Sequence, residues 1–174
     1  MIEILVRDHA EVDSLFGDLS AASDSGDARE VFGKLDYLWA RLAVHIRAEH
    51  LHLFPALLTA AGRGGAPTRE EVGAAVERLR VDHDSFMREL AAAVDASREL
   101  ASRPGLPDAE QLPGIRGRVR AVAERLVEHN RVEEDQVYGW SEVLLPGWQG
   151  DTLRAGMKRE LENLPPRLNE GLRR

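Results

Sequence analysis

Histidine and glutamate stand at core positions in each of four long amphipathic segments, and this feature restricts the fold of the chain more than any other. The segments span residues 2–22, 28–61, 69–102 and 114–144, where apolar residues recur at alternating steps of three and four. The polar residues that interrupt these apolar stripes are His9, His45, Glu49, His83, His129 and Glu133. Because burying an imidazole or a carboxylate without a partner is costly, the fold has to supply these side chains with partners.

Turn-rich breaks separate the four segments and indicate how they connect. The breaks are Ser23–Asp27, Gly62–Pro67, Pro104–Pro107 and Pro146–Gly150. Asp27 and Thr68 are each followed three residues later by a glutamate, a spacing typical of a helix N-terminus. Short connections make consecutive helices antiparallel. The sequence therefore predicts an all-α fold, an antiparallel up-down-up-down four-helix bundle.

The C-terminal tail predicts a short extra helix over about residues 151–163. Its apolar residues lie on one side, at Leu153, Met157, Leu161 and Leu164, and Pro165 and Pro166 follow it. Two roles stay open for this helix, a cap over the open end of the bundle and a contact between two copies of the chain. We expect a bundle over residues 1–145 and a helical extension over residues 146–174.

Composition and charge exclude several classes of protein. The chain has 174 residues, with 30 acidic side chains against 23 basic ones and a net charge of −7, which argues against nucleic-acid binding. The absence of cysteine excludes a disulfide scaffold, a thiolate metal site and an iron–sulfur cluster. No apolar stretch is long enough to span a bilayer, and Met1–Arg7 lacks the pattern of a secretory signal. We expect a cytoplasmic protein, a monomer or homodimer, with no membrane or nucleic-acid partner.

The six polar residues are predicted to lie at one height in the bundle. Residues of antiparallel neighbours are level when they lie equally far from the connecting loop, and the mismatches here are roughly 3–6 Å at 1.5 Å per residue. His45 with Glu49 and His129 with Glu133 are pairs four residues apart, so each pair lies on one helix face. No lysine or arginine stands in the stripes beside them. Imidazole and carboxylate ligands suit iron, manganese or zinc, and two glutamates from opposite helices can bridge two cations.

Each piece of this pattern alone has a simpler interpretation. A histidine and glutamate four residues apart usually form a solvated pair, and a single histidine in a stripe such as His9 or His83 is usually a hydrogen-bonded core residue. Their joint occurrence at one height on four helices favours a dimetal site. A bundle with satisfied polar residues and no metal is the alternative.

Three further features accompany these six residues. Asp8 precedes His9, Leu53-Phe54-Pro55 follows Glu49, and Glu134 follows Glu133. With them, the sequence resembles hemerythrin-like, HHE cation-binding domain proteins over about residues 1–145. The resemblance implies a four-helix bundle with two iron ions in a non-heme, carboxylate-bridged centre that binds dioxygen, peroxide or nitric oxide. Manganese and zinc are the alternative metals.

Departures from the oxygen-carrying hemerythrins bear on the expected function. Those proteins pair two histidines on the third helix, whereas His83 stands alone here, with Met87 at the second place. Glu133 replaces an aspartate of the fourth helix, and His50 stands where many HHE proteins have a second glutamate. Fewer protein ligands leave more positions for exchangeable ones, which favours redox chemistry or sensing over oxygen carriage.

For several neighbours of the six residues, the sequence leaves more than one role open. The alternatives for His52 are a seventh metal ligand, a proton donor and a residue that lines a channel. His50 is expected to be solvated. Asp8 and Glu134 either orient the ligands or are solvated. The aromatic residues nearby are expected to pack in the core, with redox activity as the alternative: Tyr37, Trp39, Tyr138 and Trp140.

Two classes of function follow from this resemblance. The first is a non-heme di-iron oxidoreductase, resembling a peroxidase, that removes hydrogen peroxide, nitric oxide or dioxygen. The second is a non-catalytic sensor of oxygen, nitric oxide or iron, or an iron store. Whether the protein is an enzyme stays open, because the residues supply metal ligands but identify no substrate pocket.

Overall fold

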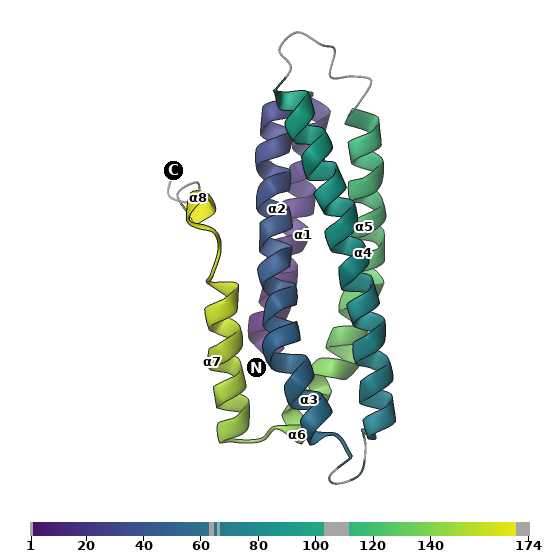
Figure 1. Ribbon diagram of the computed structural model, residues 1–174, viewed down its shortest axis with the longest axis vertical. Helices are drawn as coiled ribbons and strands as arrows, with labels where there is room; N and C mark the ends of the chain where they lie inside the picture. The colour runs from purple at the N-terminus through teal and green to yellow at the C-terminus, as the bar shows by residue number, and fades with distance from the viewer. Residues whose placement is uncertain (1, 63–64, 66, 103–111, 170–174) are drawn as a thin grey trace.

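The computed structural model describes residues 2–62, 65, 67–102 and 112–169 (Figure 1). Their helices are α1 (Ile2–Ser25), α2 (Ala28–Ala48), α3 (Phe54–Ala60), α4 (Arg69–Ala101), α5 (Leu112–Val132), α6 (Tyr138–Leu144), α7 (Trp148–Leu161) and α8 (Pro166–Asn169). Two π-helical turns, η1 (Glu49–Leu53) and η3 (Glu133–Val137), join α2 to α3 and α5 to α6. The described residues contain no strand, and the predicted all-α fold is confirmed.

Four long rods form the bundle: α1, α2 with α3, α4, and α5 with α6 (Figure 1). The Asp27 side chain accepts hydrogen bonds from the backbone of Arg29 and Glu30 and so starts α2. Thr68 and Glu71 form a reciprocal capping box at the start of α4, as predicted. The predicted break at Pro104–Pro107 lies outside the described residues.

The hydrophobic core is divided into two clusters. Leu35, Phe86 and Leu126 belong to one cluster, towards the end where α1 meets α2. Leu57 and Leu79 belong to the other, at the end where α3 meets α4. Each long rod passes from one cluster to the other at the place where its sequence carries the buried histidine or glutamate. A polar layer therefore separates two apolar halves of the core.

Helix α7 packs along the outer side of α2 and η1, and runs antiparallel to α2 (Figure 1). Leu153, Met157 and Leu161 are buried there, which confirms the predicted apolar side of this helix. The contact is close at Gly156, because a Cβ atom at this position would lie 2.9 Å from Nδ1 of His52. Of the two roles expected for this helix, the cap over the open end of the bundle is wrong, since α7 covers the side of the bundle instead.

None of the described helices combines the length and the apolar character that a membrane span requires.

Candidate metal centre

The six histidine and glutamate side chains predicted from the apolar stripes meet in the polar layer. Their exposed fractions run from 0% for Glu49 and Glu133 to 5% for His9. Each of the four rods contributes to the group, so no single helix could form it. The spacing argument therefore placed these residues at one height correctly.

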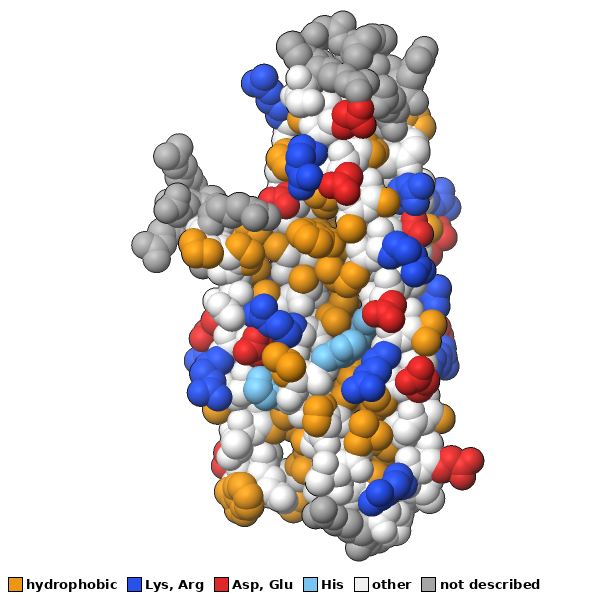
Figure 2. Space-filling model, in the orientation of Figure 1, with side chains coloured by type: hydrophobic (Ala, Val, Ile, Leu, Met, Phe, Trp, Pro, Cys, Tyr) orange, Lys and Arg blue, Asp and Glu red, His pale blue; other side chains and the backbone are white. Residues whose placement is uncertain are grey.

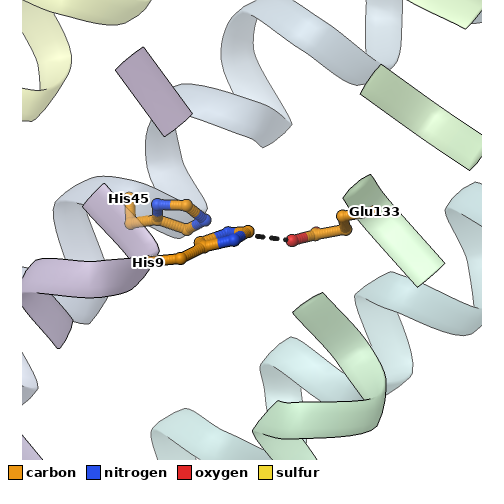
Figure 3. Close-up of side chains that lie close together, drawn as sticks. All are labelled: His9, His45 and Glu133. Atoms are coloured by element: carbon orange, nitrogen blue, oxygen red, sulfur yellow. Dashed lines mark ion pairs between the residues drawn. The ribbon is translucent and has the colours of Figure 1, made fainter. Parts of the chain in front are cut away.

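His9, His45 and Glu133 form the first of two buried triads (Figure 3). Each offers one ligand atom, and these atoms lie within 4.8 Å of one another. Nε2 of His9 is 3.3 Å from Oε2 of Glu133. Two imidazoles and a carboxylate at this separation suit a transition-metal ion.

His83, His129 and Glu133 form the second triad. Nε2 of His129 is 3.0 Å from Oε1 of Glu133, and the Nε2 atoms of the two histidines are 2.9 Å apart. Glu133 thus turns Oε2 towards the first triad and Oε1 towards the second. Two triads that share one carboxylate are consistent with a dimetal site.

Glu49 contacts one histidine of each triad. Its Oε2 lies 3.6 Å from Nε2 of His45 and 3.4 Å from Nε2 of His83. Oε2 of Glu49 and Oε1 of Glu133 are buried and have no hydrogen-bond partner. Because a buried carboxylate oxygen without a partner is costly, these two atoms fit positions that face cations.

The charges of the two glutamates differ. Burial raises the pKa of Glu49 well above its usual value, and the charge of Glu133 raises it further. Burial acts in the same direction on Glu133, but the neighbouring histidines, His129 first, hold its pKa well below the usual value. The metal-free group therefore carries one charged and one neutral carboxyl, since the low-dielectric interior does not tolerate two adjacent charges.

Burial also shifts the pKa values of the histidines. It lowers the pKa of His45 to about 3 and that of His83 well below its usual value, so both rings are neutral. A neutral imidazole is the form that ligates a metal. Burial lowers the pKa of His9 as well, but Glu133 and Glu134 outweigh this effect and raise it.

Outer hydrogen bonds fix the orientation of all four rings. Nδ1 of each ring bonds to a partner outside the triads, which leaves Nε2 directed at the glutamates. The pairs and their separations are His45 with Oδ2 of Asp8 (2.7 Å), His129 with Oδ2 of Asp82 (3.3 Å), His9 with Oε1 of Glu134 (2.7 Å), and His83 with Nε2 of His50 (3.0 Å). Asp8 and Glu134 thus orient histidines of the triads, one of the two interpretations that the sequence left open, while the side chain of Glu134 is also 39% exposed.

The remaining neighbours correct several expectations. His50 was expected to be solvated, but it is half-buried and bonds His83. His52 lies against Gly156 of α7 and belongs to neither triad. Trp39 and Trp140 are partly buried and pack against the hydrophobic clusters, as expected.

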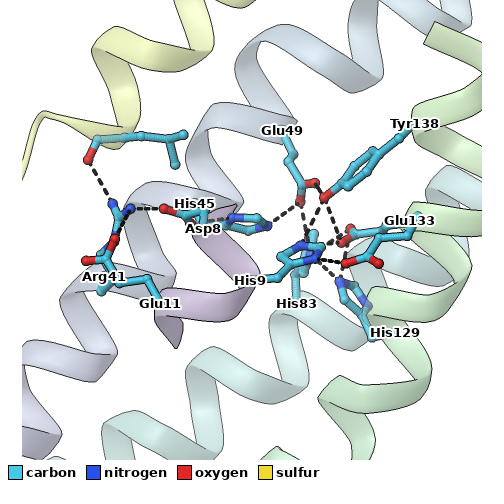
Figure 4. Close-up of polar contacts among 12 residues, drawn as sticks. Asp8, His9, Glu11, Arg41, His45, Glu49, His83, His129, Glu133 and Tyr138 are labelled. Carbon is cyan, nitrogen blue, oxygen red and sulfur yellow. Dashed lines mark hydrogen bonds and ion pairs between the residues drawn. The ribbon is translucent and has the colours of Figure 1, made fainter. Parts of the chain in front are cut away.

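Tyr138 is the residue that the sequence analysis most undervalued. Its hydroxyl lies 3.0 Å from Nε2 of His9 and 3.2 Å from an oxygen of each glutamate (Figure 4). Burial, with the charge of Glu133, raises the pKa of Tyr138 well above its usual value, so the phenol stays protonated. The expectation of simple core packing missed this placement, because an aromatic residue in an apolar stripe gives no sign of where its hydroxyl points.

The two halves of the bundle repeat the same arrangement of residues. The first half carries Asp8, His9, Arg41, His45 and Glu49, and the second carries Asp82, His83, Arg125, His129 and Glu133. The spacing from arginine to histidine to glutamate is identical in both halves. His50 corresponds to Glu134, and Phe54 to Tyr138. The repeated Asp-His pairs could have identified Asp82, and the repeated spacing of arginine, histidine and glutamate could have identified Arg41 and Arg125.

Both π-helical turns begin at a glutamate of the centre. The backbone N–H of Phe54 bonds to the carbonyl of Glu49, and that of Tyr138 to the carbonyl of Glu133, five residues back in each case. Such turns are frequent at functional sites. Pro55 and Gly139, both poor helix formers, follow at the same distance from the two glutamates and mark the turns in the sequence.

Comparison with known proteins identifies a family for this arrangement. The family model described as "Hemerythrin HHE cation binding domain" matches residues 1–141, which hold all six residues of the centre. The match ends within α6 and does not include α7. No curated protein and no solved structure matches the chain significantly.

Proposed function

Because the chain belongs to the hemerythrin HHE cation-binding family, we propose that it is a non-heme di-iron oxidoreductase that removes hydrogen peroxide, nitric oxide or dioxygen. The observation that carries this proposal is Glu133, which offers one oxygen to each of two buried histidine pairs. Iron ions bound there would supply Lewis acidity and electrons for the reduction of a small molecule.

Six side chains would hold the two ions. His9 and His45 belong to one position, His83 and His129 to the other, and Glu49 and Glu133 face both. Each position would thus have four protein donors, two histidines of its own and the two shared glutamates, which leaves room for an exchangeable ligand. The arrangement of these donors around two positions, and not only their burial, favours a metal centre over a purely structural bundle.

The interior beside the centre suits only a small substrate. A space of about 10 Å³ for the centre of a water-sized molecule lies among the four histidines, bounded by Val12, Leu42, Leu126 and Asn130. Such a space holds roughly one water molecule. Its size favours peroxide, nitric oxide or dioxygen over an organic substrate.

Tyr138 does not line this space, but it would act on a molecule bound at the metal positions themselves. Its protonated hydroxyl lies among His9, Glu49 and Glu133, where it can donate a hydrogen bond or a proton to a bound molecule. The apolar clusters on both sides of the layer exclude bulk water and keep competing proton donors away.

Metal analysis and turnover measurements test the proposal in two steps. Protein produced in iron-rich medium is expected to contain close to two iron equivalents, and an iron content near zero would leave the metal-free bundle standing. The anaerobically reduced protein is then mixed with excess hydrogen peroxide or nitric oxide and a small reductant. Repeated turnover supports the oxidoreductase, whereas a single stoichiometric reaction identifies a sensor or an iron store.

A further inference from the structure

The residues outside the triads differ between the two halves of the bundle, although the triads themselves match. We name the position of His9 and His45 the sealed position, and that of His83 and His129 the open position. We propose that the two positions are inequivalent: the sealed position retains its metal, and the open position exchanges its metal and ligands with solvent. This inference rests on the proposed dimetal function and deepens it.

An arginine supports each position through an aspartate, but the two arginines have different surroundings. Arg41 pairs with Asp8, the partner of His45 (Figure 4). Arg125 pairs with Asp82, the partner of His129. The side chain of Arg41 is 8% exposed, whereas that of Arg125 is 48% exposed. The arginine that supports the sealed position is thus buried, and the one that supports the open position is about half exposed.

Helix α7 is what buries Arg41. Nη1 of Arg41 donates to the backbone carbonyl of Leu161 at 2.8 Å, and Nη2 donates to Glu11 at 3.2 Å. Leu161 ends α7, where carbonyls lack partners within the helix and accept outside donors readily. The extension beyond the family domain therefore fixes Arg41, which fixes Asp8 and through it the ring of His45.

At the open position, a surface hollow of about 450 Å³ replaces a covering helix. It lies between α4 and α5, and Asp82, Arg125 and His129 are among its lining residues. Nε of Arg125 donates to Asp82 at 2.9 Å, so this pair stands at the edge of the hollow. Solvent reaches the partners of His129 without any movement of the bundle.

The outer partners of His9 and His83 add to the difference. His9 donates to the carboxylate of Glu134, whereas the partner of His83 is the imidazole of His50. A carboxylate partner makes the ligating nitrogen a stronger donor than a neutral ring does. Histidine reaches the surface on the face formed by α2, η1 and α4 (Figure 2), where His50 is partly exposed. Both partners reach solvent, since the side chain of Glu134 is 39% exposed, so the difference between them lies in their chemistry and not in their exposure.

Release of ferrous iron to a chelator tests the inference with the full chain. Protein loaded anaerobically with two equivalents is expected to lose one equivalent fast and the other slowly. His129→Ala should abolish the fast phase and His45→Ala the slow phase, which assigns each phase to a position. Release of both equivalents in one phase would overturn the inference but leave the proposed function intact, whereas failure to bind two equivalents would contradict the proposed function itself.

Matched arginine variants test the supports. Arg41→Met is expected to accelerate the slow phase about 10–100-fold and leave the fast phase unchanged, while Arg125→Met accelerates the fast phase only. Arg41→Lys should restore part of the slow release, because one ammonium group can reach either Leu161 or Asp8 but not both. Equal acceleration of both phases by Arg41→Met would overturn the inference.

A change in α7 alone tests its role without touching the bundle. Gly156→Val places side-chain atoms against His52 and should lift α7 from η1, which accelerates the slow phase even if Arg41→Met does not fold. The control is Ala155→Val, a β-branched substitution at the adjacent exposed position of the same helix. Identical release from the two variants would show that α7 does not seal the first position. The absorption spectrum of the iron-loaded protein, recorded in parallel, should change with Gly156→Val only.

Discussion

The hydroxyl of Tyr138 lies 3.0 Å from Nε2 of His9, the nitrogen with which this histidine faces the centre. The corresponding residue of the other half is Phe54, which has no hydroxyl. One half of an otherwise repeated arrangement therefore carries a proton donor, and the other does not. This difference leads to the first prediction.

Tyr138→Phe is expected to slow peroxide turnover about 10²-fold while the protein still binds two metal equivalents. The aromatic ring remains, and the other half of the bundle already has a phenylalanine, Phe54, at the corresponding position. Stopped-flow kinetics with metal analysis of the same sample make the measurement. Tyr37→Phe, at a half-buried tyrosine that is absent from the contacts of the centre, is the control and should turn over normally. Normal turnover of Tyr138→Phe would remove the phenol from the proposed chemistry.

Glu133→Ala is expected to reduce the metal content from about two equivalents to near zero, because Glu133 faces both positions. Quantitative metal analysis of the purified variant measures the loss. Glu128 is an exposed glutamate of α5, and Glu128→Ala should keep both equivalents. If Glu133→Ala kept one full equivalent, the carboxylate would serve a single ion and the shared arrangement would be wrong.

Glu49→Met is expected to stabilise the metal-free protein, in contrast to most core substitutions. Glu49 is fully buried, and its Oε2 has no partner, so an apolar side chain of similar length removes an unfavourable group. We expect a gain of about 1–3 kcal/mol in the free energy of unfolding. Urea unfolding of metal-free samples measures it, with the Glu128→Ala variant as a reference that should change little. A metal-free Glu49→Met variant less stable than the natural sequence would show that the polar layer is satisfied without metal.

The capping box at the start of α4 predicts a pH dependence away from the centre. Hydrogen bonds from the backbone and side chain of Thr68 lower the pKa of Glu71. A carboxyl whose pKa is lower in the folded state stabilises the fold above its unfolded value, near 4.5, and this contribution disappears as pH falls through the folded value. Glu71→Ala should therefore lower the melting temperature at pH 7 and have a smaller effect at pH 3. Thermal unfolding at the two pH values measures this, and an effect that grew on acidification would contradict it.

The members of the centre could be predicted from the sequence because they are polar residues at positions where an apolar residue is expected. A histidine or glutamate in an apolar stripe has to be explained by its neighbours, and only a common height explains six of them together. The outer partners gave no such anomaly. Asp82 precedes His83 and so leaves the stripe, and Arg41 and Arg125 are residue types that ordinarily lie at the surface.

Two other features escaped prediction for different physical reasons. The π-helical turns at Glu49 and Glu133 change the hydrogen bonding of the backbone, to which hydrophobic periodicity is insensitive over five residues. The position of α7 depends on a surface that exists only after the bundle has formed. The apolar side of this helix was predicted correctly, but two bundle surfaces were open to it, and the close approach at Gly156 favours the side over the end.

The π-helical turn at Glu133 has a geometric consequence for the whole interior. In a helix of ordinary pitch, side chains five residues apart diverge by about 140°, so a carboxylate and a phenol at that spacing would face different neighbours. Here Glu133 and Tyr138 are five residues apart and within 3.2 Å of each other. The extra residue of this five-residue turn thus brings the carboxylate and the phenol to the same side of the helix, and the acidity available to a bound molecule depends on this local irregularity of the backbone.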